Sequence, residues 1–197
     1  MNVPIIFLSS LNALFASQLG NYARSKHLAE EILNKTKLNY LIIRVPLIIG
    51  KNSPSLRAVQ KFYKKFSFCP LFGEQNGKLQ PVHLTSLVDL LGSKIKTGIH
   101  DQTVLNIVGN RFYNYREILE NILNPQIPTK KNERVRFLRI PFGLALNASR
   151  LLEKLHLPTP VSSEEIQSVN LDKAIDAGVE YGEVLKLDNA AEILFNN

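Results

Sequence analysis

The chain has 197 residues, of which 45% are hydrophobic, and a formal net charge of +7. This size allows one or two globular domains with a packed core. The basic residues do not gather in a known nucleic-acid motif, so we expect no nucleic-acid partner. The single cysteine, Cys69, excludes an intramolecular disulfide and a cysteine-based metal site. The four histidines lack ligand spacing, and we expect no metal.

Residues 1–17 are largely apolar and fit either a leader peptide or a buried strand near 4–9. The first basic residue is Arg24, so the positive region that opens a signal peptide is missing. Pro4, Ser9 and Ser10 also interrupt the apolar run. We therefore favour the strand and expect a cytoplasmic protein. No run reaches the roughly 20 apolar residues of a membrane span.

The remaining pattern alternates helices with apolar strands, which is typical of an α/β protein with a buried parallel sheet. In chain order we predict a helix at 21–36, a strand at 39–45, a helix at 55–66, a loop at 69–79, a strand at 80–84, a helix at 85–97, a strand at 103–108 and a helix at 114–123. Toward the C-terminus we predict a loop at 124–128, a short strand after the basic stretch at 130–139, a helix at 141–155 and a helix capped by Ser162 and Glu165.

The helix at 21–36 carries a tyrosine and a lysine four residues apart, Tyr22 and Lys26. This spacing puts the phenol and the ammonium on one helix face. A free tyrosine has a pKa of about 10, and a neighbouring cation favours the phenolate. The pair is therefore a candidate proton-transfer device. An ordinary surface helix can have the same spacing by chance, so the pair alone does not establish a functional site.

The flanking segments make the pattern more specific. The strand before the helix ends in Ser9 and Ser10, and the strand after it continues as Arg44-Val45-Pro46-Leu47-Ile48-Ile49-Gly50. Together with the segments at 80–84, 104–109 and 115–118, this order resembles the extended short-chain dehydrogenase/reductases of the NAD-dependent epimerase/dehydratase type. The Gln80-Pro81-Val82-His83 segment and the short spacer before Tyr22 resemble the atypical branch of that family.

The resemblance implies the C-terminal half of a Rossmann-type doubly wound parallel sheet with a small α+β substrate lobe. We expect a remnant core at 1–50, a substrate-lobe and return segment at 51–100, a late core strand and helix at 101–125, and a C-terminal lobe at 126–197. None of the ten glycines forms the family's G-x-x-G-x-x-G turn, and the loop at 73–79 is one residue short of a P-loop. We therefore expect the chain to begin near the fifth core strand, which leaves residues 4–9 as an exposed apolar edge.

The resemblance also implies roles for four residues. Tyr22 would be the acid/base, and Lys26 would bind the nicotinamide ribose of NAD or NADP and lower the pKa of Tyr22. Ser10 would hydrogen-bond the reacting oxygen. Ser9 is the fallback for that role and a cofactor-side residue. Small polar residues also commonly end strands, and that alternative stays open for both serines.

Further positions follow from the same resemblance. The loop against the nicotinamide end of the cofactor would consist of Pro46, Leu47 and Ile48. His83 and Arg44 would face the substrate, although Arg44 is equally suited to a structural ion pair. The basic stretch at 130–139 is an alternative place for a nucleotide diphosphate.

Two functions remain in view. The first is part of an NAD(P)-dependent oxidoreductase, epimerase or dehydratase that acts on a sugar nucleotide or a similar hydroxyl or carbonyl substrate. We expect this chain to be inactive alone, and to need a complementing N-terminal half or to form a homo-oligomer. The alternative is a non-catalytic binding or assembly module that keeps the fold without turnover.

Overall fold

The computed structural model describes residues 3–50, 53–74, 77–123, 135–157, 161–171 and 183–187. The chain divides into two compact units. Unit 1 comprises Met1–Gly50, Gln80–Phe112 and Lys173–Leu194, and unit 2 comprises Lys51–Leu79, Tyr113–Asp172 and Phe195–Asn197. Each unit is described by itself below.

Unit 1 is built on a four-stranded sheet with the order β1-β2-β7-β10. Its strands are β1 (Ile5–Ser10), β2 (Tyr40–Val45), β7 (Gln102–Gly109) and β10 (Glu183–Leu187). All three pairings are parallel, with Ser10 opposite Val45 and Arg44 opposite Asn106. The carboxyl ends of β1, β2 and β7 therefore reach the same edge of the sheet.

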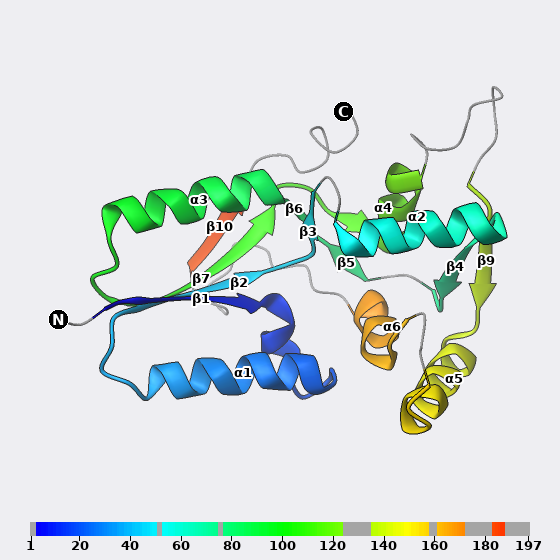
Figure 1. Cartoon of the computed structure of the whole chain (residues 1–197), viewed down its shortest axis with the longest axis horizontal. Helices are drawn as coiled ribbons and strands as arrows, with labels where there is room; N and C mark the ends of the chain where they lie inside the picture. Colours follow the sequence, from blue (N-terminus) through cyan, green and yellow to red (C-terminus); the bar gives the residue numbers. More distant parts are fainter. Residues whose placement is uncertain are drawn as a thin grey trace. The chain divides into compact units, whose positions relative to one another are not determined.

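Helices cover both faces of this sheet. In Figure 1, α3 (Leu84–Thr97) lies on one side of it and α1 (Asn21–Asn34) on the other. On the first side, Leu87 of α3 packs in one cluster with Leu41, Ile43, Val45, Leu105 and Ile107. Both faces of β2 and of most of β7 are thus buried, as their continuous apolar runs predicted. The predicted doubly wound α/β class is confirmed.

The strand β1 lies at the edge of the sheet. Among the described strands, β1 pairs with β2 alone. Val3, which precedes it, is 72% exposed, and Leu8 within it is 41% exposed. The expected apolar edge is therefore present in the described structure.

Short elements connect the main ones in unit 1. The 3-10 helix η1 (Leu11–Phe15) follows β1, and β3 (Ile48–Ile49) pairs in parallel with β6 (Val82–His83). At the end of β7, the chain crosses the segment before β6 so closely that a Cβ on Gly109 would clash with the carbonyl oxygen of Pro81. Only glycine fits this crossing.

Unit 2 is a smaller α+β assembly. Its elements are α2 (Pro54–Phe66), β4 (Cys69–Phe72), β5 (Lys78–Leu79), β8 (Tyr113–Asn114), α4 (Tyr115–Leu123), β9 (Phe137–Ile140), α5 (Phe142–Lys154) and α6 (Ser163–Asn170). β4 pairs with β9 in parallel, and β5 pairs with β8 antiparallel. One apolar cluster joins Leu71 to Leu119 and Leu123, and a second joins Phe72 to Ala145 and Ile166. This unit corresponds to the small lobe that the resemblance implied.

The boundaries of most predicted helices and core strands agree with the structure to within two residues. The capping box at Ser162 and Glu165 is also present. The predicted loop at 69–79 is wrong, because β4 and β5 lie within it. Pro70 argued against a strand in the sequence, yet the structure accommodates this proline within β4. The backbone N–H of Cys69 donates to Arg136, directly before β9, and the N–H of Gly73 donates to Ile140 at the end of β9. Successive N–H groups of a strand alternate in direction, so the N–H that Pro70 lacks would point away from β9, where no strand among the described residues pairs with β4.

The C-terminal part differs from the expected division. We placed residues 126–197 in one lobe, whereas β10 belongs to the sheet of unit 1. Leu185 and Leu187 of β10 pack against the core cluster of that sheet, which explains its position. The predicted loop at 124–128 lies outside the described residues. Within the described part of the chain, no helix combines the length and the hydropathy that crossing a membrane requires.

Candidate functional site

The candidate site begins with Tyr22 and Lys26 in the first two turns of α1. This helix starts at Asn21 with Gly20 as its N-cap, so Tyr22 and Lys26 both belong to a regular helix. The ammonium Nζ of Lys26 lies 5.8 Å from the centroid of the Tyr22 ring and 5.1 Å from that of Phe7. Tyr22 is 51% exposed, so its phenol is accessible to a ligand. The structure therefore brings together the two residues whose spacing suggested a functional pair.

Lys26 also reaches the edge strand. Its Nζ donates a hydrogen bond of 2.9 Å to the main-chain oxygen of Leu8. The backbone N–H of Ile5 donates to Asn39, so residues 5, 7 and 9 turn their main-chain groups toward β2. Because these groups alternate along a strand, the carbonyl of Leu8 points away from β2. Lys26 thus caps an edge acceptor and is held beside the carboxyl end of β1.

The two serines at the end of β1 have different surroundings. The Oγ of Ser10 accepts a hydrogen bond of 3.2 Å from the backbone N–H of Asn12, and Ser10 is the N-cap of η1. This bond uses the Oγ as acceptor and leaves the O–H as a donor. Ser9 is 2% exposed, and its Oγ donates to the carboxylate of Glu30. The hydroxyl proton of Ser9 is therefore already bound, which favours Ser10 as the residue that meets a ligand.

Glu30 connects α1 to the sheet through a buried ion pair. Its carboxylate accepts from Arg44 Nη2 at 2.7 Å and from Arg44 Nε at 3.1 Å, and the two side chains are 3% and 16% exposed. Arg44 Nη1 donates to Asn106 Oδ1 at 3.4 Å, and Asn106 Nδ2 donates to the main-chain oxygen of Glu183 at 3.3 Å. Several bonds thus compensate for the burial of these charges.

Arg44 forms an ion pair within the fold, which is the structural role that the sequence analysis left open for it. Its role toward a substrate stays a prediction. The sequence analysis did not identify Glu30. A signal for it existed, since an arginine within the apolar strand β2 requires an acidic partner, and Glu30 lies on the helix that directly precedes this strand.

The loop after β2 is fixed by strand pairing. The main-chain oxygen of Leu47 accepts from the N–H of Val82 at 3.0 Å, and Ile48 lies opposite Val82. A Cβ on Gly50 would lie 2.9 Å from the Cβ of Leu84, so the chain passes close to the start of α3. Pro46, Leu47 and Ile48 therefore leave the carboxyl end of β2 as an ordered segment. Their contact with a cofactor stays a prediction.

His83 is placed at the N-terminus of α3. Its Nδ1 accepts a hydrogen bond of 3.2 Å from the backbone N–H of Thr85, which makes His83 the N-cap. This bond requires an unprotonated Nδ1, so the proton of the neutral ring lies on Nε2. The side chain thus has a structural task, and its role toward a substrate stays a prediction.

The site as a whole fits the nicotinamide end of a dinucleotide better than its pyrophosphate. An exposed phenol, an ammonium and a hydroxyl donor gather at the carboxyl edge of a parallel sheet, which is where such sheets bind ligands. A pyrophosphate needs a glycine-rich turn before a helix N-terminus, and the sequence contains no G-x-x-G-x-x-G.

No protein-family model matches the sequence, and no curated protein matches it either. Solved structures do match the fold. The structure named gox2253 has a TM-score of 0.59 at 13% identity, over 98% of this chain and 64% of that chain. The dTDP-4-dehydrorhamnose reductase of Bacillus anthracis str. Ames in complex with NADP has a TM-score of 0.55 at 14% identity, over 83% and 63%.

A third match is the dTDP-glucose 4,6-dehydratase of the same organism in complex with NAD. Its TM-score is 0.51 at 17% identity, over 84% of this chain and 60% of that chain. The chain thus spans about 60% of the length of the structures it matches. At these identities the likeness concerns the fold. The described chain has the fold of NAD(P)-dependent sugar-nucleotide dehydratases and reductases, as the sequence resemblance implied.

Proposed function

We propose that this chain supplies the proton-transfer part of an NAD(P)-dependent epimerase, dehydratase or reductase that acts on a sugar nucleotide. The observation that carries this proposal is the grouping of the exposed Tyr22, one helical turn from Lys26, with Ser10 at the carboxyl edge of the sheet. The substrate class is taken from the structures that share the fold, which act on dTDP-sugars by their names.

In this proposal each residue has one task. A bound nicotinamide would accept or return a hydride at the substrate carbon. The Tyr22 phenolate would take the proton from the hydroxyl on that carbon, or the phenol would return it to a carbonyl. Lys26 would donate hydrogen bonds to the ribose, beside the ring of Tyr22. Ser10 would donate its O–H to the reacting oxygen.

The buried pair of Glu30 and Arg44 would act as a positioning device. Glu30 lies one turn beyond Lys26 on α1, and Arg44 lies on β2, so their ion pair ties the helix that carries Tyr22 to the sheet. Ser9 joins the same carboxylate from β1. A proton-transfer group must be held within hydrogen-bond reach of its substrate, and these bonds fix α1 to the sheet one turn beyond Lys26.

The adenosine and pyrophosphate would be bound by residues outside this sequence. We infer a complementing polypeptide with a glycine-rich turn, whose last strand would pair with the free edge of β1. Pairing between two copies of this chain is the alternative. Isolated, the chain is expected to turn over no substrate, because the tight hold on the cofactor would be missing.

A second function is favoured by one specific observation. Ser9, Arg44 and His83 all make hydrogen bonds within the fold, and the ammonium of Lys26 is bound to Leu8. A non-catalytic binding or assembly module would keep these structural bonds and need nothing more.

The two functions are separated by an assay of NADPH oxidation with a dTDP-4-keto sugar. The chain is combined with a candidate N-terminal polypeptide that carries a G-x-x-G-x-x-G turn. We expect turnover, and a loss of about 10²-fold or more in Tyr22→Phe, since the acid/base is removed. Tyr63→Phe in unit 2 is the matched control and should keep the wild-type rate. Turnover that survives Tyr22→Phe would contradict the assignment, and no turnover at all would favour the module.

A further inference from the structure

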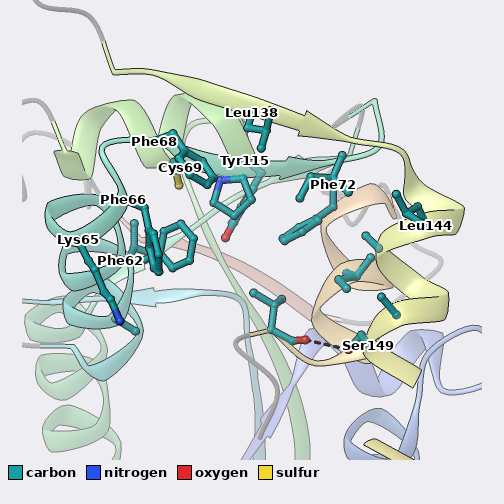
Figure 2. A pocket seen from close by; sticks show the side chains of 18 of the residues that line it. Phe62, Lys65, Phe66, Phe68, Cys69, Phe72, Tyr115, Leu138, Leu144 and Ser149 are labelled. Atoms are coloured by element: carbon teal, nitrogen blue, oxygen red, sulfur yellow. Dashed lines mark hydrogen bonds between the residues drawn. The ribbon is translucent and has the colours of Figure 1, made fainter. Parts of the chain in front are cut away.

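Unit 2 contains an open cavity of about 740 Å³ that the proposed function does not use. Its walls come from α2, β4, α4, β9, α5 and α6. Figure 2 shows Phe62, Phe66 and Phe68 on one side of the cavity and Phe72 and Leu144 on the other. The volume lies within the range of about 300–1,000 Å³ that small-molecule sites have. The cavity is therefore large enough for a ligand of lipid size.

The phenylalanines form one continuous aromatic wall. The ring centroids of Phe62 and Phe66 are 4.6 Å apart, and Phe68 meets Phe62 edge-on at 5.7 Å. This apolar surface is open to water, since Phe66 is 46% exposed and Leu138 and Leu144 across from it are 50% and 64% exposed. Such a grouping of exposed apolar side chains around a cavity indicates an occupant with a hydrocarbon surface.

The charged side chains of the lining all have one sign. Among the described residues that line the cavity, the charged ones are Lys61 and Lys65, both exposed on α2. The Nζ of Lys65 lies 5.2 Å from the centroid of the Phe66 ring, so this cation stands directly beside the apolar wall. A ligand with a negative group next to its apolar part would match this arrangement.

The lining of the cavity also includes a neutral polar group, the phenol of Tyr115. Tyr115 lines it from the start of α4, and burial raises the pKa of its phenol, so the hydroxyl keeps its proton at neutral pH. The other hydroxyl of the lining, that of Ser149, already donates to the main-chain oxygen of Val161 at 2.9 Å (Figure 2). The interior therefore offers little polar recognition, which suits a plain hydrocarbon chain.

We propose that this cavity binds a single hydrocarbon chain that ends in an anionic head group, a carboxylate or a phosphate. The chain would lie between the aromatic wall and α5, and the head group would stay at the mouth beside Lys61 and Lys65. A second copy of this protein is a poorer occupant, because its net charge of +7 would add positive charge at a basic mouth. This inference concerns unit 2 alone and does not rest on the proposed function.

The first test compares head groups on the full chain. Displacement of cis-parinaric acid is measured with oleate, dodecyl phosphate and oleyl alcohol. We expect both anions to bind, and the uncharged alcohol to bind about tenfold more weakly, as the loss of two partly solvated ion pairs predicts. The double variant Lys61→Gln/Lys65→Gln should bind oleate no better than the alcohol. Lys64→Gln, on the same helix outside the lining, should bind like the wild type. Displacement by only one of the two anions would identify the head group as carboxylate or phosphate.

The second test fills the cavity from α5. Ala148 lines it and is exposed, so Ala148→Phe should occupy the space of the chain and reduce oleate affinity by about tenfold or more. Asn147→Phe adds the same ring to an exposed neighbour outside the lining and should leave affinity unchanged. Circular dichroism confirms folding. If Ala148→Phe does not fold, the head-group series decides. The proposal is overturned if no anion binds, if the alcohol binds as well as oleate, or if the wild type self-associates instead.

Discussion

The ammonium of Lys26 lies 2.9 Å from the main-chain oxygen of Leu8, on the side of β1 where no strand pairs among the residues that the structure describes. An N–H group of a strand added to this edge would donate a hydrogen bond to the same carbonyl. Completion of the sheet would therefore release Lys26 from Leu8 and leave its donors for another acceptor, such as a ribose. The edge of β1 and the charge beside Tyr22 are thus physically linked.

The first prediction concerns the strength of this bond. Because Lys26 is partly exposed, Lys26→Met should lower the free energy of unfolding by about 1 kcal/mol or less. Urea titration of the isolated chain measures this change, and Lys37→Met, an exposed lysine after the helix, is the control. A loss of several kcal/mol would mean that Lys26 is chiefly a structural residue, and would argue against its release to a cofactor.

A larger effect is expected at the pair of Glu30 and Arg44. Glu30→Gln leaves the Arg44 charge without its buried partner, which should cost about 3–5 kcal/mol. The double variant Glu30→Leu/Arg44→Met should lose less than Glu30→Gln, because no uncompensated charge remains. Chemical denaturation of the single and double variants gives these values.

The exposed ion pair of Arg116 and Glu120 is the control for these variants of Glu30 and Arg44. Its side chains are 48% and 37% exposed, so Glu120→Gln should change stability by less than about 1 kcal/mol. Equal losses at the two pairs would contradict the view that burial makes the Glu30–Arg44 pair important.

The crossing at Gly109 allows a matched test of backbone packing. Gly109→Ala forces a methyl group onto the carbonyl of Pro81, and we expect a loss of at least about 1–3 kcal/mol. Gly92 lies within α3, and a Cβ there would meet nothing within 4 Å. Gly92→Ala should therefore stabilise the protein by about 0.5–1 kcal/mol through helix propensity. Thermal unfolding of both variants checks the opposite signs.

The thiol of Cys69 should react slowly in the folded protein. Burial raises its pKa from 9.0 to about 11, and the reactive thiolate is therefore scarce at pH 8. Iodoacetamide labelling at pH 8 should be slow in buffer and fast in urea. Rapid labelling of the folded chain would contradict the buried position of Cys69.

The same shift predicts a dependence of stability on pH. The folded state favours the neutral thiol, so its contribution is complete below about pH 9 and is lost as the pH rises toward about 11. The stability difference between the wild type and Cys69→Ala should narrow across that window. A constant difference would show that the thiol does not titrate differently in the two states.

Sequence patterns predicted the core of unit 1 well because its strands are recognisable from apolar runs within single segments. The apolar runs around Ile42 and Ile107 have to be buried on both faces, and this alone indicates a parallel sheet with covering helices. The strand β4 was missed because Pro70 argues against any strand whose pairing partner is unknown. β10 was missed because its short, half-buried sequence Glu183–Leu187 is equally typical of a surface segment.

The candidate site was predictable in its members but not in its bonds. The spacing of Tyr22 and Lys26 is a property of one helix, and the structure has it. The different surroundings of Ser9 and Ser10 depend on Glu30 and Asn12, and no local rule decides which serine meets which partner. An arginine within the apolar strand β2 indicates an acidic partner, but only the fold, which brings α1 beside Arg44, identifies that partner as Glu30.

The most direct test of the central claim is to map the binding of nicotinamide mononucleotide, which carries the nicotinamide and its ribose without the adenosine. The isotope-labelled chain is titrated with millimolar ligand, and amide chemical shifts are followed by NMR. The account predicts shifts confined to Ser10, the first two turns of α1, Leu47 and Ile48, and their loss in Lys26→Met. No shifts in the wild type, or shifts centred on other segments, would contradict the assignment of this edge of the sheet to a nicotinamide cofactor.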